Sequence, residues 1–289
     1  MATFTANEVA ACLRLIELAL AEDLEQSGDR TSSATIPATT VAAAAFVARS
    51  PGVVAGLPAA GMVCRAVDPS LAFQPLVEDG SLVDRGTRLA TVSGSLRSIL
   101  AAERVALNFL QHLSGVATLT RKFVDAAAGF RAKILDTRKT IPGWRRLEKY
   151  AVRCGGGANH RMGLHDGILI KDNHLAGLGG DVRRAVEAAR NFPGNAHLPV
   201  EVEVESLEQL DQALEVRADI VLLDNMDLEH LRKAVSRKDA IAPDVLLEAS
   251  GGVNLSTVRD IAATGVDRIS VGALTHSAPA LDIALDYTS

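Results

Sequence analysis

The chain has 289 residues, of which 48% are hydrophobic and 22% charged, and its formal net charge is −5. This acidic balance and an aromatic content of 3% exclude the extended basic face and the base-stacking surface that nucleic-acid-binding proteins need. The three cysteines (Cys12, Cys64 and Cys154) form no CxxC pair, so they predict neither a disulfide framework nor a zinc knuckle, but a reducing, cytoplasmic location.

Residues 5–25 predict an amphipathic helix. Arg14 and Glu17 interrupt its apolar run at helical spacing, so the segment is neither a signal peptide nor a membrane span, and no membrane partner is expected. Residues 40–96 predict short strands separated by glycine turns. Within them, residues 77–94 resemble half of a lipoyl-type domain without the lysine hairpin that would carry a prosthetic group. A helix over residues 96–117 is predicted to follow.

The second half of the chain alternates short apolar runs with helical patterns. Strands are predicted at residues 132–137, 167–172, 198–205, 219–225, 245–250 and 267–272. Helices are predicted near residues 145–154, 181–191, 206–217, 228–237 and 255–264. This alternation is typical of parallel βα units, whose right-handed crossovers curl a sheet toward a barrel. Six units rather than eight predict an incomplete, open α/β barrel.

Together the two patterns predict an α/β protein of two domains. Residues 1–114 are expected to form the first domain, and residues 115–274 the barrel. The tail from Pro279 onward is predicted to be helical, and residues 275–289 are expected to pack back on the first domain.

The strongest charge asymmetry lies in residues 131–174. This stretch holds ten Lys or Arg against four Asp or Glu, a surplus of six positive charges in a chain whose total is −5. Arginine forks and lysine point charges bind carboxylates and phosphates. A compact pocket for a small polyanion therefore explains the asymmetry better than a nucleic-acid surface.

In βα barrels the chemistry lies at the carboxyl ends of the strands. Thr137, Arg138 and Lys139 follow the first predicted strand, and Lys171 ends the second. His160 and Arg161 follow three glycines, residues 155–157, which suggest a mobile loop over a ligand. The alternatives are a solvated basic turn and glycines that simply cap a helix. We expect an anion pocket, because these segments converge on one rim.

Acidic residues mark the next strand ends. Glu201, Glu203 and Glu205 alternate with valines, and Asp224 ends the neighbouring strand. Two carboxylates plus substrate phosphates commonly hold Mg²⁺, so Glu203 and Asp224 are the predicted metal ligands. The alternative is a solvated edge face.

Two glycine-containing loops follow the last two strands. They comprise Ser250, Gly251, Gly252, Val271, Gly272 and Ala273. Backbone N–H groups in such loops commonly bind phosphate in βα barrels, whereas the alternative is two ordinary turns.

The run DTRKTIPGWRRLEKYAVRCGGGANHRMGLHDGILIKDNH, residues 136–174, resembles the core signature of the quinolinate phosphoribosyltransferase family. The resemblance continues through residues 28–32, 101–118, 200–210, 221–225, 248–253 and 271–286. Departures occur at Ile141, Trp144 and Ala249, none of which is charged.

This resemblance implies a type II phosphoribosyltransferase-like fold, with an N-terminal α/β sandwich domain and an open, seven-stranded barrel. It implies transfer of phosphoribose from phosphoribosyl pyrophosphate to quinolinate with decarboxylation, in NAD biosynthesis. It also implies at least a homodimer, with Arg104 reaching across to the partner's site. The implied catalytic residues are Lys139, Lys171, Glu203 and Asp224. The implied substrate contacts are Arg104, Thr137, Arg138, Lys139, His160, Arg161, Lys171 and the two glycine loops.

Three other functions remain open. A molybdenum-transport-linked paralogue of the same superfamily would use another acceptor. A Schiff-base aldolase would use Lys171, although the neighbouring carboxylates disfavour the neutral amine that such a reaction needs. A binding protein would bind the anion without releasing pyrophosphate.

Overall fold

The computed structural model describes residues 3–288. They divide into two compact units. The first comprises the chain up to Arg121, Thr140–Gly156 and the chain from Leu274 onward, and the second comprises Lys122–Lys139 and Gly157–Ala273. The boundary predicted after residue 114 falls inside a continuous helix, α4 (Leu96–Ala126), which leads from one unit into the other.

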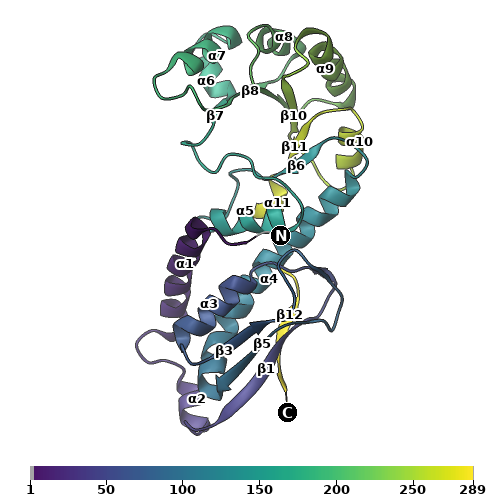
Figure 1. Cartoon of the computed structure of the whole chain (residues 1–289). Helices are drawn as coiled ribbons and strands as arrows, with labels where there is room; N and C mark the ends of the chain where they lie inside the picture. The colour runs from purple at the N-terminus through teal and green to yellow at the C-terminus, as the bar shows by residue number, and fades with distance from the viewer. Residues whose placement is uncertain (1–2, 289) are drawn as a thin grey trace. The chain divides into compact units, whose positions relative to one another are not determined.

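A four-stranded antiparallel sheet forms the centre of the first unit (Figure 1). Its order is β12-β1-β5-β3, with bounds β12 (Ile283–Thr288), β1 (Val41–Ala48), β5 (Arg88–Ser95) and β3 (Ala72–Pro75). The helices α1 (Ala6–Leu24), α2 (Arg30–Thr35) and α3 (Leu57–Val67) accompany it, and β2 (Gly52–Val53) pairs with β4 (Leu82–Val83). The predicted first helix and short strands are confirmed, while α3 was not predicted.

The C-terminal tail is a strand and not the predicted helix. β12 pairs antiparallel with β1, from Ala43 opposite Thr288 to Ala48 opposite Ile283. Leu281, Ile283 and Leu285 are buried while the residues between them are not, which is the alternation of a strand. The run LDIALDY also fits helical spacing, which explains the error. β12 thereby extends the antiparallel sheet of the first unit.

Helix α5 (Arg145–Cys154) belongs to the first unit, although the sequence suggested a crossover helix of the barrel. Its Tyr150 is fully buried and donates its hydroxyl to Asp79 at 2.6 Å. Asp79 also accepts the backbone N–H groups of Gly56 and Leu57, at the start of α3. These bonds satisfy backbone N–H groups at the start of α3 that have no partner within the helix. The Asp79 carboxylate therefore joins α5 to α3.

Six parallel strands form the second unit, as predicted. Their order is β6-β11-β10-β9-β8-β7, with bounds β6 (Lys133–Leu135), β11 (Arg268–Ser270), β10 (Leu246–Ser250), β9 (Ile220–Asp224), β8 (Val200–Val204) and β7 (Ile168–Ile170). The seventh strand implied by the resemblance is reduced, among residues 3–288, to a single parallel bridge between Leu135 and Ala158. The sheet is therefore an open barrel with Ala158 beside its β6 edge.

Helices follow the strands along the outside of this sheet (Figure 1). They are α6 (Asp172–Ala176), α7 (Val182–Asn191), α8 (Leu207–Glu215), α9 (Leu228–Ile241) and α10 (Val258–Ala262). The short helix α11 (Ala273–His276) follows β11, and from Leu274 onward it belongs to the first unit. Side chains of Asp181, Ser206 and Asp227 accept backbone N–H groups in the first turns of α7, α8 and α9. No helix within residues 3–288 combines the length and apolarity needed to cross a membrane.

Candidate functional site

The second unit contains every predicted site residue except Arg104, which is exposed on α4 in the first unit. All the others lie on or just beyond the carboxyl ends of parallel strands. They are Thr137, Arg138 and Lys139 after β6, His160 and Arg161 after the Ala158 bridge, Lys171 after β7, Glu203 on β8, Asp224 on β9, Ser250, Gly251 and Gly252 at the end of β10, and Val271, Gly272 and Ala273 after β11.

Strand β8 is buried on both faces, so its glutamates are not a solvated edge. Successive residues of a strand point to opposite faces, and all five residues of VEVEV are buried. Glu203 pairs in register with Leu222, two residues before Asp224, so Glu203 and Asp224 share one face of the sheet. Glu205 lies beyond the strand and is exposed.

Lys171 and Glu203 form an ion pair between Nζ and Oε2. The Glu203 side chain is 10% exposed and the lysine 45%, so the ammonium group extends from a buried carboxylate toward solvent. The backbone N–H of Lys171 donates to Nδ1 of His174 at 2.8 Å, which gives that histidine a structural role. At the neighbouring strand end, Asn225 donates to Asp224 at 2.6 Å.

A second charged group lies among the buried residues, and we call His160, Glu201, Glu248 and Arg268 the His160 cluster. His160 Nε2 lies 3.0 Å from Glu201 Oε2 and 3.4 Å from Glu248 Oε1. Arg268 Nε lies 2.7 Å from Glu248 Oε2. The sequence predicted no role for Glu248 or Arg268. Their only sequence signal is a charge within the apolar runs LLEAS and DRISV.

Two observations on the protonation of the His160 cluster point in opposite directions: the pKa of His160 and the hydrogen bond at its Nδ1. Burial lowers the pKa of His160, but Glu201 and Glu248 outweigh burial and raise it to about 9. Burial raises the pKa of the Glu201 carboxyl. An imidazolium has hydrogens on both nitrogens, whereas the Arg161 N–H points at Nδ1 from 2.8 Å and needs a lone pair there. The additional proton is therefore a property of the His160–Glu201 pair as a whole and is not assigned to either partner.

We expect the free energy of unfolding to fall as the pH rises. Because the pair's pKa is raised above the ordinary histidine value of 6.5, the folded protein binds this proton more tightly than the unfolded chain. The stabilisation is fully present below pH 6.5 and is lost as the pH rises through about 9; it amounts to about 3 kcal/mol. Thermal melts from acid to alkaline pH measure it. In Glu248→Gln the free energy of unfolding should decrease less steeply with pH. The same pH dependence in the wild type and this variant would contradict the assignment of the proton to the His160 cluster.

Asp136 holds the main chain that carries the histidine. It is fully buried at the end of β6 and accepts the Asn159 side-chain amide at 2.5 Å and the backbone N–H of His160 at 2.9 Å. The two glycines before this segment have structural duties. A Cβ on Gly155 would lie 2.4 Å from the carbonyl oxygen of Ala117, and Gly156 has φ +89°. Close packing accounts for Gly155 and a left-handed turn for Gly156.

The guanidinium groups of Arg138 and Arg161 lie within range of each other's charge at the rim. Burial, followed by the charge of Arg138, lowers the pKa of Arg161. Nε of Arg161 is buried and has no hydrogen-bond partner among the described residues, while its Nη1 donates to the Gly167 carbonyl at 3.1 Å. An anionic ligand would stabilise this arrangement, because it would compensate the two positive charges and accept from the buried Nε of Arg161.

The loop after β10 has a conformation that only glycine adopts readily. Gly251 has φ +95°, and a Cβ there would lie 2.1 Å from Asn225 Oδ1. Gly252 has φ +60° with open space around it. The backbone N–H of Asn225 donates to the Ser250 carbonyl at 3.0 Å, which ties this loop to the end of β9. After β11, Val271 donates to the Leu135 carbonyl at 2.9 Å.

The positive charge of residues 131–174 is divided between the units. Arg145, Arg146, Lys149 and Arg153 lie on α5 in the first unit. Lys149 is fully buried, and Arg153 pairs with Glu8 at 2.5 Å. Four of the ten basic residues that pointed to an anion pocket therefore lie in the first unit, and two of them, Lys149 and Arg153, stabilise its packing.

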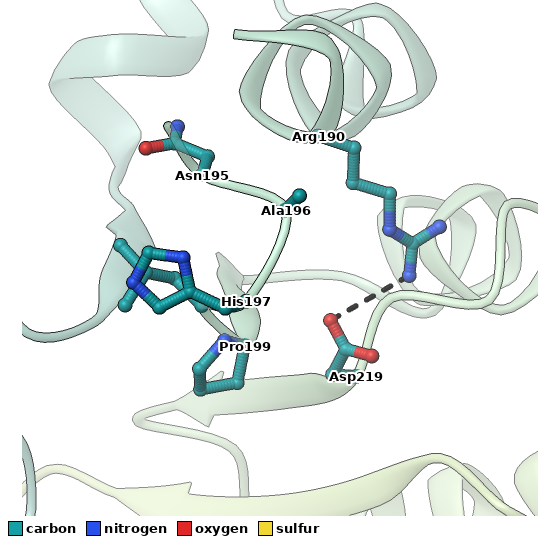
Figure 2. A pocket seen from close by; sticks show the side chains of 7 residues that line it. Arg190, Asn195, Ala196, His197, Pro199 and Asp219 are labelled. Atoms are coloured by element: carbon teal, nitrogen blue, oxygen red, sulfur yellow. Dashed lines mark ion pairs between the residues drawn. The ribbon is translucent and has the colours of Figure 1, made fainter. Parts of the chain in front are cut away.

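A hollow of about 480 Å³ lies at the opposite, amino ends of the strands (Figure 2). Arg190, His197 and Asp219 are among its lining residues. Arg190 lies 3.6 Å from Asp219 and donates to the carbonyl groups of Val216 and Arg217 beyond α8. These contacts stabilise a helix end, and in this architecture polar residues at the amino end serve stability rather than chemistry.

Two family models together match nearly all of the chain. The model of the quinolinate phosphoribosyl transferase C-terminal domain matches residues 116–286, and that of the N-terminal domain matches residues 29–114. The chain is 50% identical over 283 residues to the nicotinate-nucleotide pyrophosphorylase (carboxylating) of Mycobacterium leprae, covering 96% of this chain and 98% of that protein. The chloroplastic protein of the same name from Arabidopsis thaliana is 43% identical, with 98% and 88% covered. The structure of the nicotinate-nucleotide pyrophosphorylase from Francisella tularensis superposes with a TM-score of 0.91 at 41% identity, with 96% of each chain covered.

Proposed function

The chain belongs to the quinolinate phosphoribosyltransferase family, and from this premise we propose that it transfers phosphoribose from phosphoribosyl pyrophosphate to quinolinate. The products are nicotinate mononucleotide, pyrophosphate and carbon dioxide, formed in the biosynthesis of NAD. Among the structural observations, the collection of Arg138, Arg161 and Lys171 just beyond the carboxyl ends of parallel strands carries the most weight.

Quinolinate has two adjacent carboxylates, and two arginine forks match them. Arg138 and Arg161 would bind these carboxylates, with Lys139 beside them on the loop after β6. Bidentate contacts fix both the position and the plane of the pyridine ring, and so direct its nitrogen at C1 of the ribose. Such positioning can replace about 7 kcal/mol or more of the entropic cost of joining two substrates.

The donor would lie on the neighbouring strand ends. Backbone N–H groups of the loops Ser250–Gly252 and Val271–Ala273 would bind the 5′-phosphate, and Lys171 would contact the pyrophosphate. Thr137 would add a hydroxyl at the same rim. Once the ring nitrogen is bonded to C1 it is cationic, and this charge stabilises the carbanion left when the 2-carboxylate departs. Decarboxylation therefore needs no strongly basic side chain.

The residues present fit a magnesium ion. Glu203 and Asp224 share a face of the sheet on neighbouring strands, and they offer the hard oxygen ligands that Mg²⁺ prefers, with substrate phosphates and water completing the set. One oxygen of Glu203 faces Lys171, which leaves the other for a cation. When bound, Mg²⁺ would neutralise charge on the departing pyrophosphate.

Glu203→Ala is expected to raise the Mg²⁺ concentration for half-maximal activity about tenfold or more, because one of two carboxylate ligands is lost. Activity measured across a Mg²⁺ titration gives this value. Asp224→Asn should have a similar effect without disturbing Lys171. Glu205→Ala is the matched control, since Glu205 is exposed beyond the strand. An unchanged Mg²⁺ titration in both site variants would place the metal elsewhere.

A homodimer in which Arg104 completes the partner's site is part of this proposal. Arg104 is exposed on α4, on the unit that does not contain the other site residues. An inactive Arg104→Ala protein mixed with an inactive Lys171→Ala protein should recover activity in hybrid dimers, because one of the two sites is then intact. No recovery after subunit exchange would place Arg104 in its own subunit's site.

Two rival functions are disfavoured. A Schiff-base lysine must be a neutral amine, whereas Lys171 is paired with the buried carboxylate of Glu203. The molybdenum-transport-linked paralogue is disfavoured by the names of the relatives and by their coverage of the whole chain.

Release of carbon dioxide and pyrophosphate from quinolinate, phosphoribosyl pyrophosphate and Mg²⁺ tests the proposed reaction. Nicotinic acid is the parallel acceptor, because it lacks the second carboxylate. We expect turnover with quinolinate as the acceptor and none with nicotinic acid. No turnover with either acceptor would reject this function in favour of another acceptor or a binding role.

A further inference from the structure

The His160 cluster has a role that the proposed reaction does not by itself assign. Its members come from different segments: His160 follows the Ala158 bridge, Glu201 lies on β8, Glu248 on β10 and Arg268 on β11. Glu248 and Arg268 are opposite each other in the parallel register. The side chains of Glu201 and Glu248 are 5% and 0% exposed, so the sheet encloses two carboxylates beneath its charged rim.

The hydrogen-bond pattern determines which ring nitrogen of His160 carries the proton. Nδ1 accepts the backbone N–H of Arg161 at 2.8 Å, so this nitrogen has a lone pair. Nε2 must then carry hydrogen, and it lies between the two carboxylates at 3.0 and 3.4 Å. This tautomer excludes a metal ion on Nε2, because that nitrogen has no lone pair to offer.

Both ring nitrogens are thus engaged by the protein, and the side chain of His160 is only 9% exposed. The expectation that His160 contacts quinolinate directly does not match this geometry. The neighbouring Arg161 is the residue that the ring holds. Its backbone N–H is bound to Nδ1, its Nη1 to Gly167, and its buried Nε remains without a partner among the described residues.

We propose that Glu201 and Glu248 act through the His160 ring as positioning residues, which hold the following arginine ready to receive a substrate carboxylate. This inference rests on the proposed function. Glu201 lies 3.0 Å from Nε2 and fixes the ring there, the negative charge of Glu248 lies 3.4 Å from the same nitrogen, and the ring fixes the arginine by accepting at Nδ1. Arg268 compensates Glu248, since a buried carboxylate left uncompensated would be costly.

The test compares His160→Asn with His160→Ala. An asparagine amide oxygen can take the place of Nδ1 as an acceptor for the Arg161 N–H, whereas alanine offers none. We expect His160→Ala to raise KM for quinolinate about thirtyfold to a hundredfold, as for a misplaced binding group, with KM for phosphoribosyl pyrophosphate unchanged within about threefold. His160→Asn should recover most of this loss. Glu248→Gln, which weakens the acceptor but keeps the shape, should raise KM for quinolinate about tenfold.

Three results would overturn the assignment. Equal increases in KM for both substrates would indicate general damage, and an unchanged KM for quinolinate in His160→Ala would remove the positioning role. An equal increase in KM for quinolinate in His160→Asn and His160→Ala would show that the acceptor at Nδ1 does not position Arg161. Calorimetric titration of quinolinate into each protein provides a readout without turnover. A wild-type protein that neither binds nor turns over quinolinate would reject the proposed function, whereas an active wild type with normal variants would reject only this inference.

Discussion

Replacing Arg138 by alanine is expected to lower kcat/KM for quinolinate by about a hundredfold or more without lowering the melting temperature. Arg138 is exposed on the loop after β6 and lies near Arg161, so its removal deletes half of a carboxylate clamp. Loss of one partner from a desolvated, hydrogen-bonded charge pair costs about 2–5 kcal/mol, and each 1.4 kcal/mol is about a factor of ten. Steady-state kinetics with each substrate varied in turn measure the change.

Two further variants sharpen the Arg138 experiment. Arg138→Lys keeps the charge but loses the planar fork, so it should fall between wild type and alanine. Arg183→Ala is the matched control, because Arg183 is exposed on α7 and pairs with the half-exposed Glu215. A normal affinity for quinolinate in Arg138→Ala would remove this residue from the clamp.

Replacing Gly251 by alanine is expected to raise KM for phosphoribosyl pyrophosphate about a hundredfold. The new Cβ would lie 2.1 Å from Asn225 Oδ1 and 3.0 Å from the Asn225 backbone nitrogen, at φ +95°. The loop must then move, and its N–H groups can no longer direct themselves at the 5′-phosphate. A misplacement of about 1 Å can cost about a hundredfold in rate or affinity.

Gly252→Ala provides the comparison for this experiment. Gly252 also has positive φ, but no atom lies within 4 Å of its added Cβ. Only the left-handed conformation is penalised, by about 1–2 kcal/mol, so the increase in KM should stay near tenfold. Kinetics and binding of ribose 5-phosphate to both variants give the two values. Equal effects at the two positions would show that backbone strain, and not the contact with Asn225, governs this loop.

Each parallel strand was predictable from sequence because it is a short apolar run that ends in polar residues, and β8 and β9 in particular are buried on both faces. The tail was not, because LDIALDY satisfies both helical and alternating spacing, and pairing with β1 selects the strand. Helix α5 was predicted at its observed residues, but its membership in the first unit depends on Tyr150 and Arg153, whose partners are distant in sequence.

The candidate site divides in the same way. Arg138, Lys171, Glu203 and Asp224 could be singled out because each directly follows or ends a predicted strand. The role of Glu248 and Arg268 could not, since it depends on their register across two neighbouring strands. The sequence likewise suggested His160 as a ligand contact, whereas the structure shows both of its nitrogens facing protein atoms.

Sequence by itself determined the family, the order of strands and helices, and the charged residues at the strand ends, because these are local patterns or direct similarity. Only the tertiary structure decided which carboxylates are neutralised by which cations, which histidine nitrogen carries a proton, and which arginines belong to the site. Those properties depend on distances between segments that lie dozens of residues apart. Strand register and burial set these distances, and no local pattern encodes them.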